Sequence, residues 1–278
     1  TPGSSGAYTE ITVAASAPTL YYYCSSHSGM GGQANTPTTN SFSNFAGSIQ
    51  SNISPNTNAG FSIVSFTGTG AAATVGHGLG STPEMIIFKN RTDSVAWPVY
   101  NKTTGSSKYL QLQSNAAQSA NSAVMFNSTD PTSSVFSVKT YNGSNGSSDD
   151  LIAYCFTSIK GYSKIGSYTG NGSTDGAFVY TGFKPGWVML KRTNSTSNWT
   201  LWDTARQDNE INKPLYADLT NAEAAQTTVK LDLLSNGFKI RGNGCNVGTS
   251  GSTYVYMAFA ESPFVANDSG TAIPTTAR

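Results

Sequence analysis

Three side chains that could bind a redox metal lie close together near the start of the chain. The segment TLYYYCSSHSGMGG, residues 19–32, places Cys24, His27 and Met30 at short, regular intervals. A thiolate, two imidazoles and a weak thioether are the ligands of a blue-copper electron-transfer centre. The spacing raises the hypothesis of a copper site, provided that a second imidazole comes near these side chains.

The chain offers no convenient second imidazole. It contains two histidines, and His77 lies in a different region from His27. In the structural alternative, YYYC is an inward-facing strand, Cys24 is a small buried apolar residue and SGMGG is a turn. We favour this alternative and expect no bound metal and no cofactor. Cys24, His27 and Met30 would then keep the spacing of a copper loop without binding copper.

The other motifs do not compose a catalytic site. The sequence contains no G-x-S-x-G, H-E-x-x-H or C-x-x-C pattern. The stretches GHGLG at Gly76 and GNGSTDG at Gly170 do not open a helix after a parallel strand, so they predict hairpin turns. Asp149 and Asp150 lie in a Ser- and Gly-rich loop that favours solvated carboxylates. We expect a non-enzymatic protein, although an acidic pair for glycan cleavage stays open.

Composition and charge exclude several classes of partner. Charged residues are 11% of the chain, against about 25% in average proteins, and the net charge is +1. Without a run of Lys or Arg, no surface for nucleic acid is expected. No stretch approaches the ~20 apolar residues of a membrane span, so we expect no membrane insertion. Three distant cysteines (Cys24, Cys155 and Cys245) argue against a disulfide framework, and we expect Thr1 to be an internal or processed start.

An internal repeat is the most informative feature of the sequence. The segment FSIVSFTGTGAAATVGHGLGSTPEMIIFKNR, which starts at Phe61, resembles KIGSYTGNGSTDGAFVYTGFKPGWVMLKRT, which starts at Lys164. The chain is therefore a tandem duplication of a unit of about 100 residues, with one short gap where GHGLGSTP is longer than YTGFKP. Three pairs of residues match at one constant offset: Pro83 with Pro185, Lys89 with Lys191, and Trp97 with Trp199.

Each unit has the sequence pattern of β-structure. Short apolar runs rich in β-branched and aromatic residues, such as EMIIFKNR and GWVMLKRT, are bounded by Gly, Pro and Asn/Ser/Thr signals. Such closely spaced strands predict an all-β fold of tandem antiparallel β-sandwich modules. The exception is LTNAEAAQTTVKLDLL, residues 219–234, which could hold a helical turn or two.

These patterns divide the chain into five parts. We expect the end of an incomplete β-sandwich at 1–36, a linker and leading strand at 37–60, a β-sandwich repeat at 61–161, a second repeat at 162–264, and a polar tail at 265–278. The two repeats are called the first copy and the second copy below.

The duplication also sorts candidate functional residues. Large residues kept in both copies favour a shared core over a sugar-stacking surface. Residues that only one copy has are better candidates for a separate role, although none of them makes a site by itself. The kept pairs are Trp97 with Trp199, Tyr100 with Trp202, and Met85 with Trp187. The differing positions are His77 opposite Thr181, Asn101 opposite Asp203, and the loop 142–150.

The repeated motifs resemble a domain of bacteriophage proteins. GFSIVSFTGTGAAATVGHGLGSTPEMIIFKNR and GYSKIGSYTGNGSTDGAFVYTGFKPGWVMLKRT, with YVYMAFAESPF, are similar to a domain of tail and fibre proteins of tailed phages, cyanophages among them. The resemblance covers residues 45–278. It implies β-sandwiches along a virion appendage, in homo-oligomers that are often trimers, and it implies no catalytic residues.

The start of the chain resembles a different domain. TEITVAASAPTLYYYCSSHSGMGGQ, which begins at Thr9, is similar to the last two strands of a cupredoxin-like sandwich of the sort inserted in phage tail proteins. In copper-binding cupredoxins the loop between those strands supplies Cys, His and Met, and Cys24, His27 and Met30 occupy it in order. The family's second histidine has no match upstream. The resemblance implies common ancestry of the fold without the metal, with the first strands of that domain before Thr1.

Several functions stay open at this point. The leading hypothesis is a non-enzymatic tail-fibre or appendage component of a virion, a homotrimer that contacts other virion proteins and attaches to host-surface polysaccharide. The many copies on a particle would turn weak sugar contacts into avidity. The alternatives are an architectural role as a capsid decoration, head fibre or tail connector, a fibre-borne polysaccharide depolymerase, and copper electron transfer.

Overall fold

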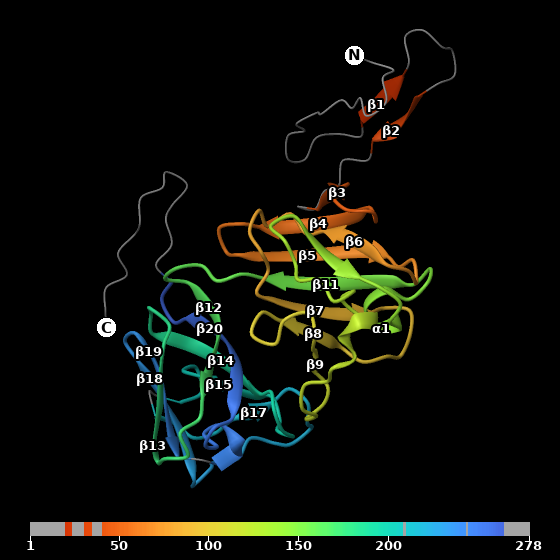
Figure 1. Cartoon of the computed structure of the whole chain (residues 1–278). Coiled ribbons are helices and arrows are strands. Elements are labelled where there is room, and N and C mark those ends of the chain that lie inside the picture. Colours follow the sequence, from red (N-terminus) through yellow and green to blue (C-terminus); the bar gives the residue numbers. More distant parts are fainter. Residues whose placement is uncertain (1–19, 24–30, 35–40, 208–209, 243, 264–278) are drawn as a thin grey trace. The chain divides into compact units, whose positions relative to one another are not determined.

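The fold is all-β, with antiparallel sheets (Figure 1). The computed structural model describes residues 20–23, 31–34, 41–207, 210–242 and 244–263. The chain divides into two compact units, Thr1–Phe42 and Ser43–Arg278. In the first unit, β1 (Leu20–Tyr23) pairs with β2 (Gly31–Ala34).

The copper-like loop cannot be placed, because Cys24, His27 and Met30 all lie outside the described residues. The same is true of the predicted tail at 265–278. The absence of a bound metal therefore stays a prediction from the sequence.

The first copy is built from a large and a small antiparallel sheet. The large sheet contains, in spatial order, β3 (Phe42–Asn44), β4 (Ser51–Asn56), β5 (Phe61–Thr67), β11 (Asp150–Phe156), β7 (Met85–Asn90), β8 (Pro98–Asn101) and β9 (Leu110–Gln111). The small sheet pairs β6 (Ala73–Gly76) with β10 (Val135–Val138). Two short helices, η1 (Asn121–Val124) and α1 (Asn142–Asn145), complete this copy.

The second copy repeats this plan with two sheets that are closer to each other in size. Its five-stranded sheet contains β12 (Ser163–Thr169), β20 (Thr253–Ala260), β14 (Pro185–Arg192), β15 (Thr200–Asp203) and β17 (Leu215–Tyr216). Its four-stranded sheet contains β13 (Asp175–Tyr180), β19 (Gly237–Gly242), β18 (Val229–Leu234) and β16 (Glu210–Ile211). The helix η2 spans Gly244–Asn246.

The strand pairing follows the same order in both copies. In the first copy β11 lies between β5 and β7, and in the second copy β20 lies between β12 and β14. The pair β6–β10 corresponds to β13–β19, with Val135 opposite Gly76 and Gly237 opposite Tyr180. Gly76 and Tyr180 therefore occupy equivalent positions.

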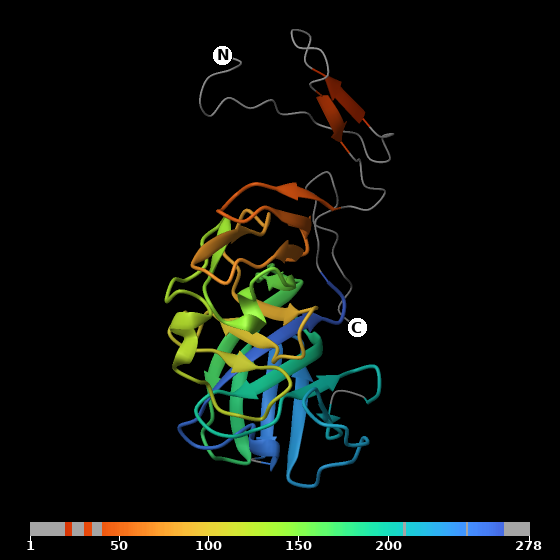
Figure 2. The same ribbon diagram turned by 90° about the vertical axis from the view of Figure 1, so that its right-hand side faces the viewer.

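Three apolar cores lie between the sheets. One core fills the first copy around Phe88, Phe136 and Leu151, and a second fills the second copy around Trp202, Phe238 and Tyr254. A third core joins the large sheets of both copies, which Figure 2 shows from the side. Its buried members are Met85, Val99, Leu110, Ile165, Met189, Trp199, Val255 and Met257.

The third core explains why strands such as β7 carry apolar residues at consecutive positions. In β7, Ile86 and Phe88 face the core of the first copy, whereas Met85 and Ile87 face the second copy. A strand that is buried on both faces carries apolar residues at consecutive positions instead of alternating with polar ones. The two copies therefore pack as one body.

The glycine-rich segments connect facing sheets, so the prediction of hairpin turns is wrong. β5 and β6 belong to different sheets, as do β6 and β7, and β12 and β13. Gly70 and Gly172 have φ angles of +64° and +72°, a region that favours glycine. A Cβ on Gly68 would lie 2.0 Å from the carbonyl oxygen of Gly146, so this turn also requires a close backbone approach.

The predicted helical turn in residues 219–234 is also wrong. No helix forms there, and Val229–Leu234 is strand β18. Val229, Leu231 and Leu233 alternate toward the core, as expected of a strand, and the residues NAEAA before them form neither helix nor strand. None of the helices in the described ranges is long and apolar enough to cross a membrane.

Candidate functional site

The large residues that both copies keep lie mostly in the cores, as predicted. Trp199, Trp202, Tyr100 and Met85 are buried, and Trp97 and Trp187 are half-buried. The indole N–H of Trp199 donates to the carbonyl oxygen of Gln111 at 2.8 Å. Met85, Trp187 and Trp199 belong to the core that joins the copies, whereas Tyr100 and Trp202 pack in the core of their own copy.

His77, which only the first copy has, is a buried structural residue. Its Nδ1 accepts a hydrogen bond from the N–H of Leu79 at 3.2 Å, so Nε2 carries the proton and faces the carbonyl oxygen of Thr132 at 3.2 Å. Burial lowers the pKa of His77, and the hydrogen bond with Thr132 acts in the opposite direction. Thr181 contacts the N–H of Phe183 in the same way, so both residues hold the same turn.

The remaining residues that differ between the copies have separate partners. Buried Asn101 accepts a hydrogen bond from the N–H of Thr103 at 2.9 Å. In the loop 142–150, buried Asn145 donates to the carbonyl oxygens of Ala71 at 2.7 Å and Lys139 at 2.6 Å. The structure does not bring His77, Asn101 and this loop together.

No metal cluster emerges from the described part of the chain. Within it, no group of three or more His, Cys, Asp or Glu side chains is placed to hold a metal ion. Cys155 is a buried free thiol whose pKa burial raises. Asp149 accepts a hydrogen bond from the side chain of Asn90 at 2.7 Å, so the prediction of two solvated carboxylates is wrong for Asp149.

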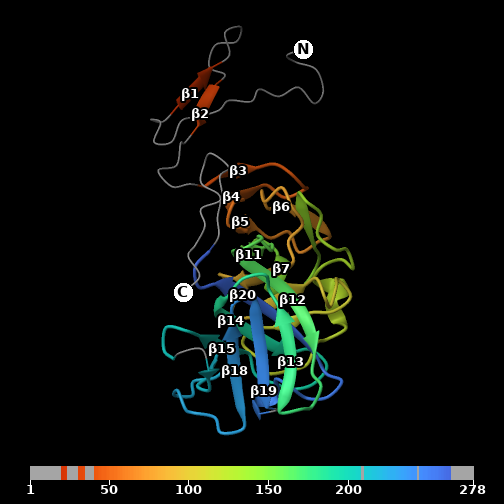
Figure 3. The ribbon, with the colours of Figure 1, turned by 90° about the vertical axis from the view of Figure 1, so that its left-hand side faces the viewer.

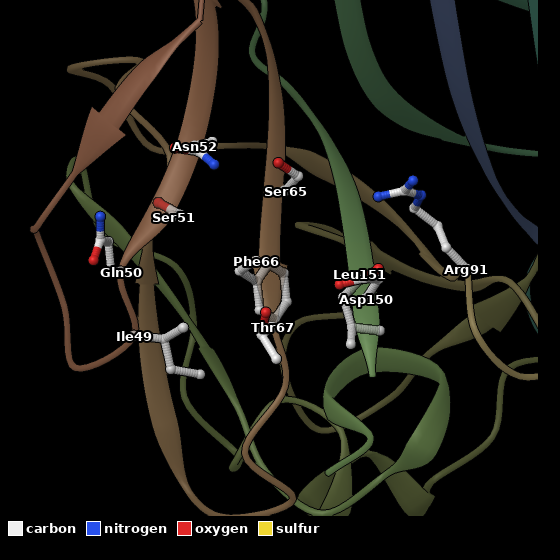
Figure 4. A pocket seen from close by; sticks show the side chains of 10 residues that line it. All are labelled: Ile49, Gln50, Ser51, Asn52, Ser65, Phe66, Thr67, Arg91, Asp150 and Leu151. Carbon is white, nitrogen blue, oxygen red and sulfur yellow. The ribbon is translucent and has the colours of Figure 1, made fainter. Parts of the chain in front are cut away.

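A polar groove lies at one end of the seven-stranded sheet (Figure 4). It encloses a cavity of about 480 Å³ over the ends of β4, β5 and β11 and beside the loop that follows β7. Its lining consists of Ile49, Gln50, Ser51, Asn52, Ser65, Phe66, Thr67, Arg91, Asp150 and Leu151. We call this feature the groove.

The pairing of residues between the strands determines which of these side chains face the groove. Asn52 lies opposite Ser65, and Thr67 lies opposite Asp150, so these four side chains share the outer face of the sheet. The neighbouring residues Ser51, Phe66 and Leu151 point inward and are buried. The groove therefore has a polar surface on a rigid, packed sheet.

Arg91 is held in place through its backbone. Its N–H donates to the carbonyl oxygen of Asp150 at 2.8 Å, and the N–H of Asp150 donates to the hydroxyl of Thr92 at 2.9 Å. Figure 4 shows the guanidinium group extending from this loop toward β11 and β5. These two hydrogen bonds hold the backbone around Arg91 beside the groove, so its guanidinium group can extend over the groove.

Most polar side chains of the groove have unused hydrogen-bonding capacity. Among the described residues, the side chains of Gln50, Ser65, Thr67, Arg91 and Asp150 make no hydrogen bond or ion pair. Together they offer an amide, two hydroxyls, a guanidinium and a carboxylate to a ligand. This mixture of donors and acceptors suits a ligand rich in hydroxyl groups.

Half-buried apolar side chains continue the same outer face beyond the groove. Ile63 lies opposite Tyr154, and Phe61 lies opposite Phe156, in the strands β5 and β11. The rings of Phe61 and Tyr154 are nearly parallel, with centroids 6.5 Å apart. Phe156 packs against the third core, so this part of the face leads toward the second copy.

The groove belongs to the first copy alone. Arg91 and Asp150 correspond to Thr193 and Thr253, whose backbones make the equivalent hydrogen bond at 2.9 Å without the two charges. β4 has no counterpart in the second copy, where β12 is the edge of the described sheet. The duplicated fold therefore does not require these polar side chains.

Sequence reasoning singled out only Asp150 among the polar groove residues. Asn52 and Ser65 were not identifiable, because their pairing across β4 and β5 depends on register. A signal existed for Arg91, since a charged residue there stands opposite Thr193 in the aligned copies. The same comparison could have found Asp150 opposite Thr253.

Comparison with known proteins identifies a family without a known activity. A family model described as a domain of unknown function (DUF7483) matches residues 34–263. The match spans both copies, so the pair is the unit that the family shares. No curated protein and no solved structure matches the chain.

Proposed function

The chain belongs to the DUF7483 family, and we propose that it is a non-enzymatic virion appendage protein that attaches to glycans of a host surface. The observation that carries this proposal is the groove, where five polar side chains have no hydrogen-bond or ion-pair partner among the residues that the structure describes. Hydroxyl-rich sugars bind through such convergent donors and acceptors on a rigid scaffold.

The carboxylate of Asp150 in the groove favours binding of a glycan over its hydrolysis. Most glycosidases place two carboxyl groups on either side of the scissile bond. Asp150 is the one acidic residue that lines the groove, and Asp149 next to it is bonded to Asn90. A depolymerase would need a second acid from another chain, and this is the weaker candidate.

Two features of the sequence support the proposed place on a virion. The T-G-N-G, G-F-x-P and K-R-T motifs resemble tail and fibre proteins, and the low charge suits a surface exposed to varied salt. A homotrimer would present three grooves, so that several weak contacts with sugars would together give a high overall affinity. An architectural role, as a capsid decoration or tail connector, is the second candidate.

Binding of the labelled protein to whole cells tests the proposal. The protein is added to a panel of bacterial strains, cyanobacteria among them, and cell-bound fluorescence is measured. We expect binding to at least one strain, and a loss of about tenfold in affinity for Arg91→Ala, because hydrogen bonds to charged groups contribute roughly 1.5–3 kcal/mol. Lys160→Ala is the matched control, since it removes an exposed cation elsewhere in the first copy.

The alternatives predict other results. Binding to no strain, together with density that places the chain on the capsid, would support the architectural role. Release of sugar from a bound polysaccharide would support a depolymerase. Equal binding by Arg91→Ala and the unchanged protein would show that attachment does not use the groove.

A further inference from the structure

The four-stranded sheet of the second copy exposes aromatic rings on its outer face. Figure 3 shows β13, β19 and β18 side by side in this sheet. Phe178 is 46% exposed and Tyr180 is 65% exposed, whereas Val179 between them is buried in the core. Alternation along β13 therefore directs both rings to the side away from the core.

The register places the two rings in a small apolar floor. Tyr180 lies opposite Gly237, and Gly237 lies opposite Leu234, which is 38% exposed. A Cβ on Gly237 would lie 3.1 Å from the ring of Phe178, so this ring leans over the glycine. Phe178, Tyr180, Gly237 and Leu234 form what we call the platform.

Balanced charges border the platform. Asp175 contacts Lys239 at 2.7 Å and Arg241 at 2.6 Å, and Arg241 also contacts Asp232 at 2.6 Å. The two acids and two bases neutralise one another, so this border does not select a strongly charged ligand. Their oxygen and nitrogen atoms can still exchange hydrogen bonds with hydroxyl groups.

The first copy lacks the platform for a structural reason. Thr74 and Gly76 stand where the second copy has Phe178 and Tyr180. A Cβ on Gly76 would lie 2.8 Å from the carbonyl oxygen of Ala46, because the segment before β4 covers this face. The aromatic rings are therefore an addition of the second copy and are not needed by the shared fold.

The size of the platform favours a sugar over a protein partner. Stable protein interfaces bury about 800 Å² on each partner and involve roughly 20–30 residues a side. The platform offers two rings and one leucine, with paired charges immediately beside them. A pyranose ring matches this area, because its C–H face packs on an aromatic ring while its hydroxyls reach the polar border.

We infer that the platform is a second carbohydrate site, one that takes a neutral hexose ring by stacking on Phe178 and Tyr180. The inference rests on the proposed function for the class of ligand, but it uses a different sheet and a different copy from the groove. The two sites differ in chemistry, since the groove offers free polar groups and the platform offers ring faces.

Calorimetric titration with neutral tetrasaccharides tests the inference. Cellotetraose, maltotetraose and tetra-N-acetylchitotetraose are each titrated up to about 10 mM, which detects affinities in the millimolar range. We expect at least one to bind, and Tyr180→Ala and Phe178→Ala each to weaken it by about tenfold. Both side chains are exposed, so neither change should unfold the protein. Phe45→Ala is the matched control, because Phe45 is 74% exposed in the segment before β4, outside the second copy.

The outcomes separate this inference from the groove. Binding that Tyr180→Ala weakens and Arg91→Ala leaves unchanged supports the platform even if the groove proposal fails. Binding of none of the three sugars, or equal binding by Tyr180→Ala and Phe45→Ala, overturns the platform. Attachment to cells that depends on Arg91 alone would leave the proposed function standing without a second site.

Discussion

The ammonium group of Lys191, in the second copy, donates a hydrogen bond of 3.0 Å to the backbone carbonyl of Asn115 in the first copy. Lys191 is fully buried, and it also donates to the carbonyl oxygen of Ser197 at 2.5 Å. Its equivalent, Lys89, makes the same local bond to Val95 at 2.8 Å but stays half-buried beside Trp97. One lysine of the repeat has thus become a buried link between the copies.

The burial of Lys191 predicts a stability that rises with pH. Burial lowers its pKa from 10.5 to about 8, and nearby Asp218 acts in the opposite direction. Between these two values the unfolded chain holds more protons than the folded chain, so unfolding becomes less favourable as pH rises through this window. The gain for this one group is about 2 kcal/mol between pH 7 and pH 9.5.

Comparing the unchanged protein with Lys191→Met measures this effect. Methionine keeps the length and apolar stem of the side chain and removes the charge. We expect the free energy of unfolding of the unchanged protein, relative to Lys191→Met, to increase from pH 7 to pH 9.5 in denaturant titrations. Parallel pH profiles of the two proteins would mean that Lys191 is not shielded from water.

His77 predicts a loss of stability in acid. Burial lowers its pKa from the usual 6.5, and its Nδ1 already accepts the N–H of Leu79. The unfolded chain therefore takes up a proton first as pH falls below about 6.5, and stability drops. Protonation of Nδ1 would also break the bond to Leu79.

His77→Thr imitates the second copy, where Thr181 holds the same turn. We expect this variant to be less stable by about 1–2 kcal/mol at pH 7.5, because it loses packing and one hydrogen bond. Its melting temperature should fall less than that of the unchanged protein between pH 7.5 and pH 5.5. An equal fall in both would contradict the assignment of the acid effect to His77.

The shared core predicts that both copies unfold together. Trp199 is 1% exposed, lies between the large sheets and donates to Gln111. Trp199→Ala should cost about 3–5 kcal/mol, the usual range for a buried Trp or Phe. In the unchanged protein we expect a single transition in calorimetry, and two separate transitions would show that the copies fold independently.

Trp97→Ala is the control that the duplication provides. Trp97 occupies the equivalent position but is half-buried, where it contacts the Lys89 ammonium at 5.4 Å from the ring. We expect this change to cost clearly less than Trp199→Ala, since an exposed cation–π contact contributes about 0.5–1 kcal/mol. Similar losses for both variants would contradict the special role of Trp199.

Much of the fold was predictable because the sequence repeats. Equivalent apolar runs, such as those at Met85 and Trp187, marked the strands in both copies, and the aligned tryptophans marked a core. The hairpin prediction failed because a glycine-rich turn does not reveal whether the next strand joins the same sheet. The helix prediction for residues 219–234 failed because a short run of helix-forming residues is too short to form a helix without packing, and the apolar residues that follow form a strand.

The candidate site was harder to predict, since it depends on contacts between distant strands. Thr67 and Asp150 are paired across β5 and β11, which only the register reveals. Phe178 and Tyr180 flank the buried Val179, and their pattern shows alternation but not which face is left open. In the first copy the segment before β4 covers the equivalent face, at Gly76, and such covering is a feature of tertiary structure.

The affinity of the protein for a purified envelope polysaccharide tests the central claim most directly. The polysaccharide of a strain that binds the protein is immobilised, and equilibrium binding is measured by surface plasmon resonance for the unchanged protein, Arg91→Ala, Asp150→Asn and Lys160→Ala. We predict that both groove variants lose about tenfold in affinity and that Lys160→Ala binds normally. Equal affinity of all four proteins would contradict attachment through the groove.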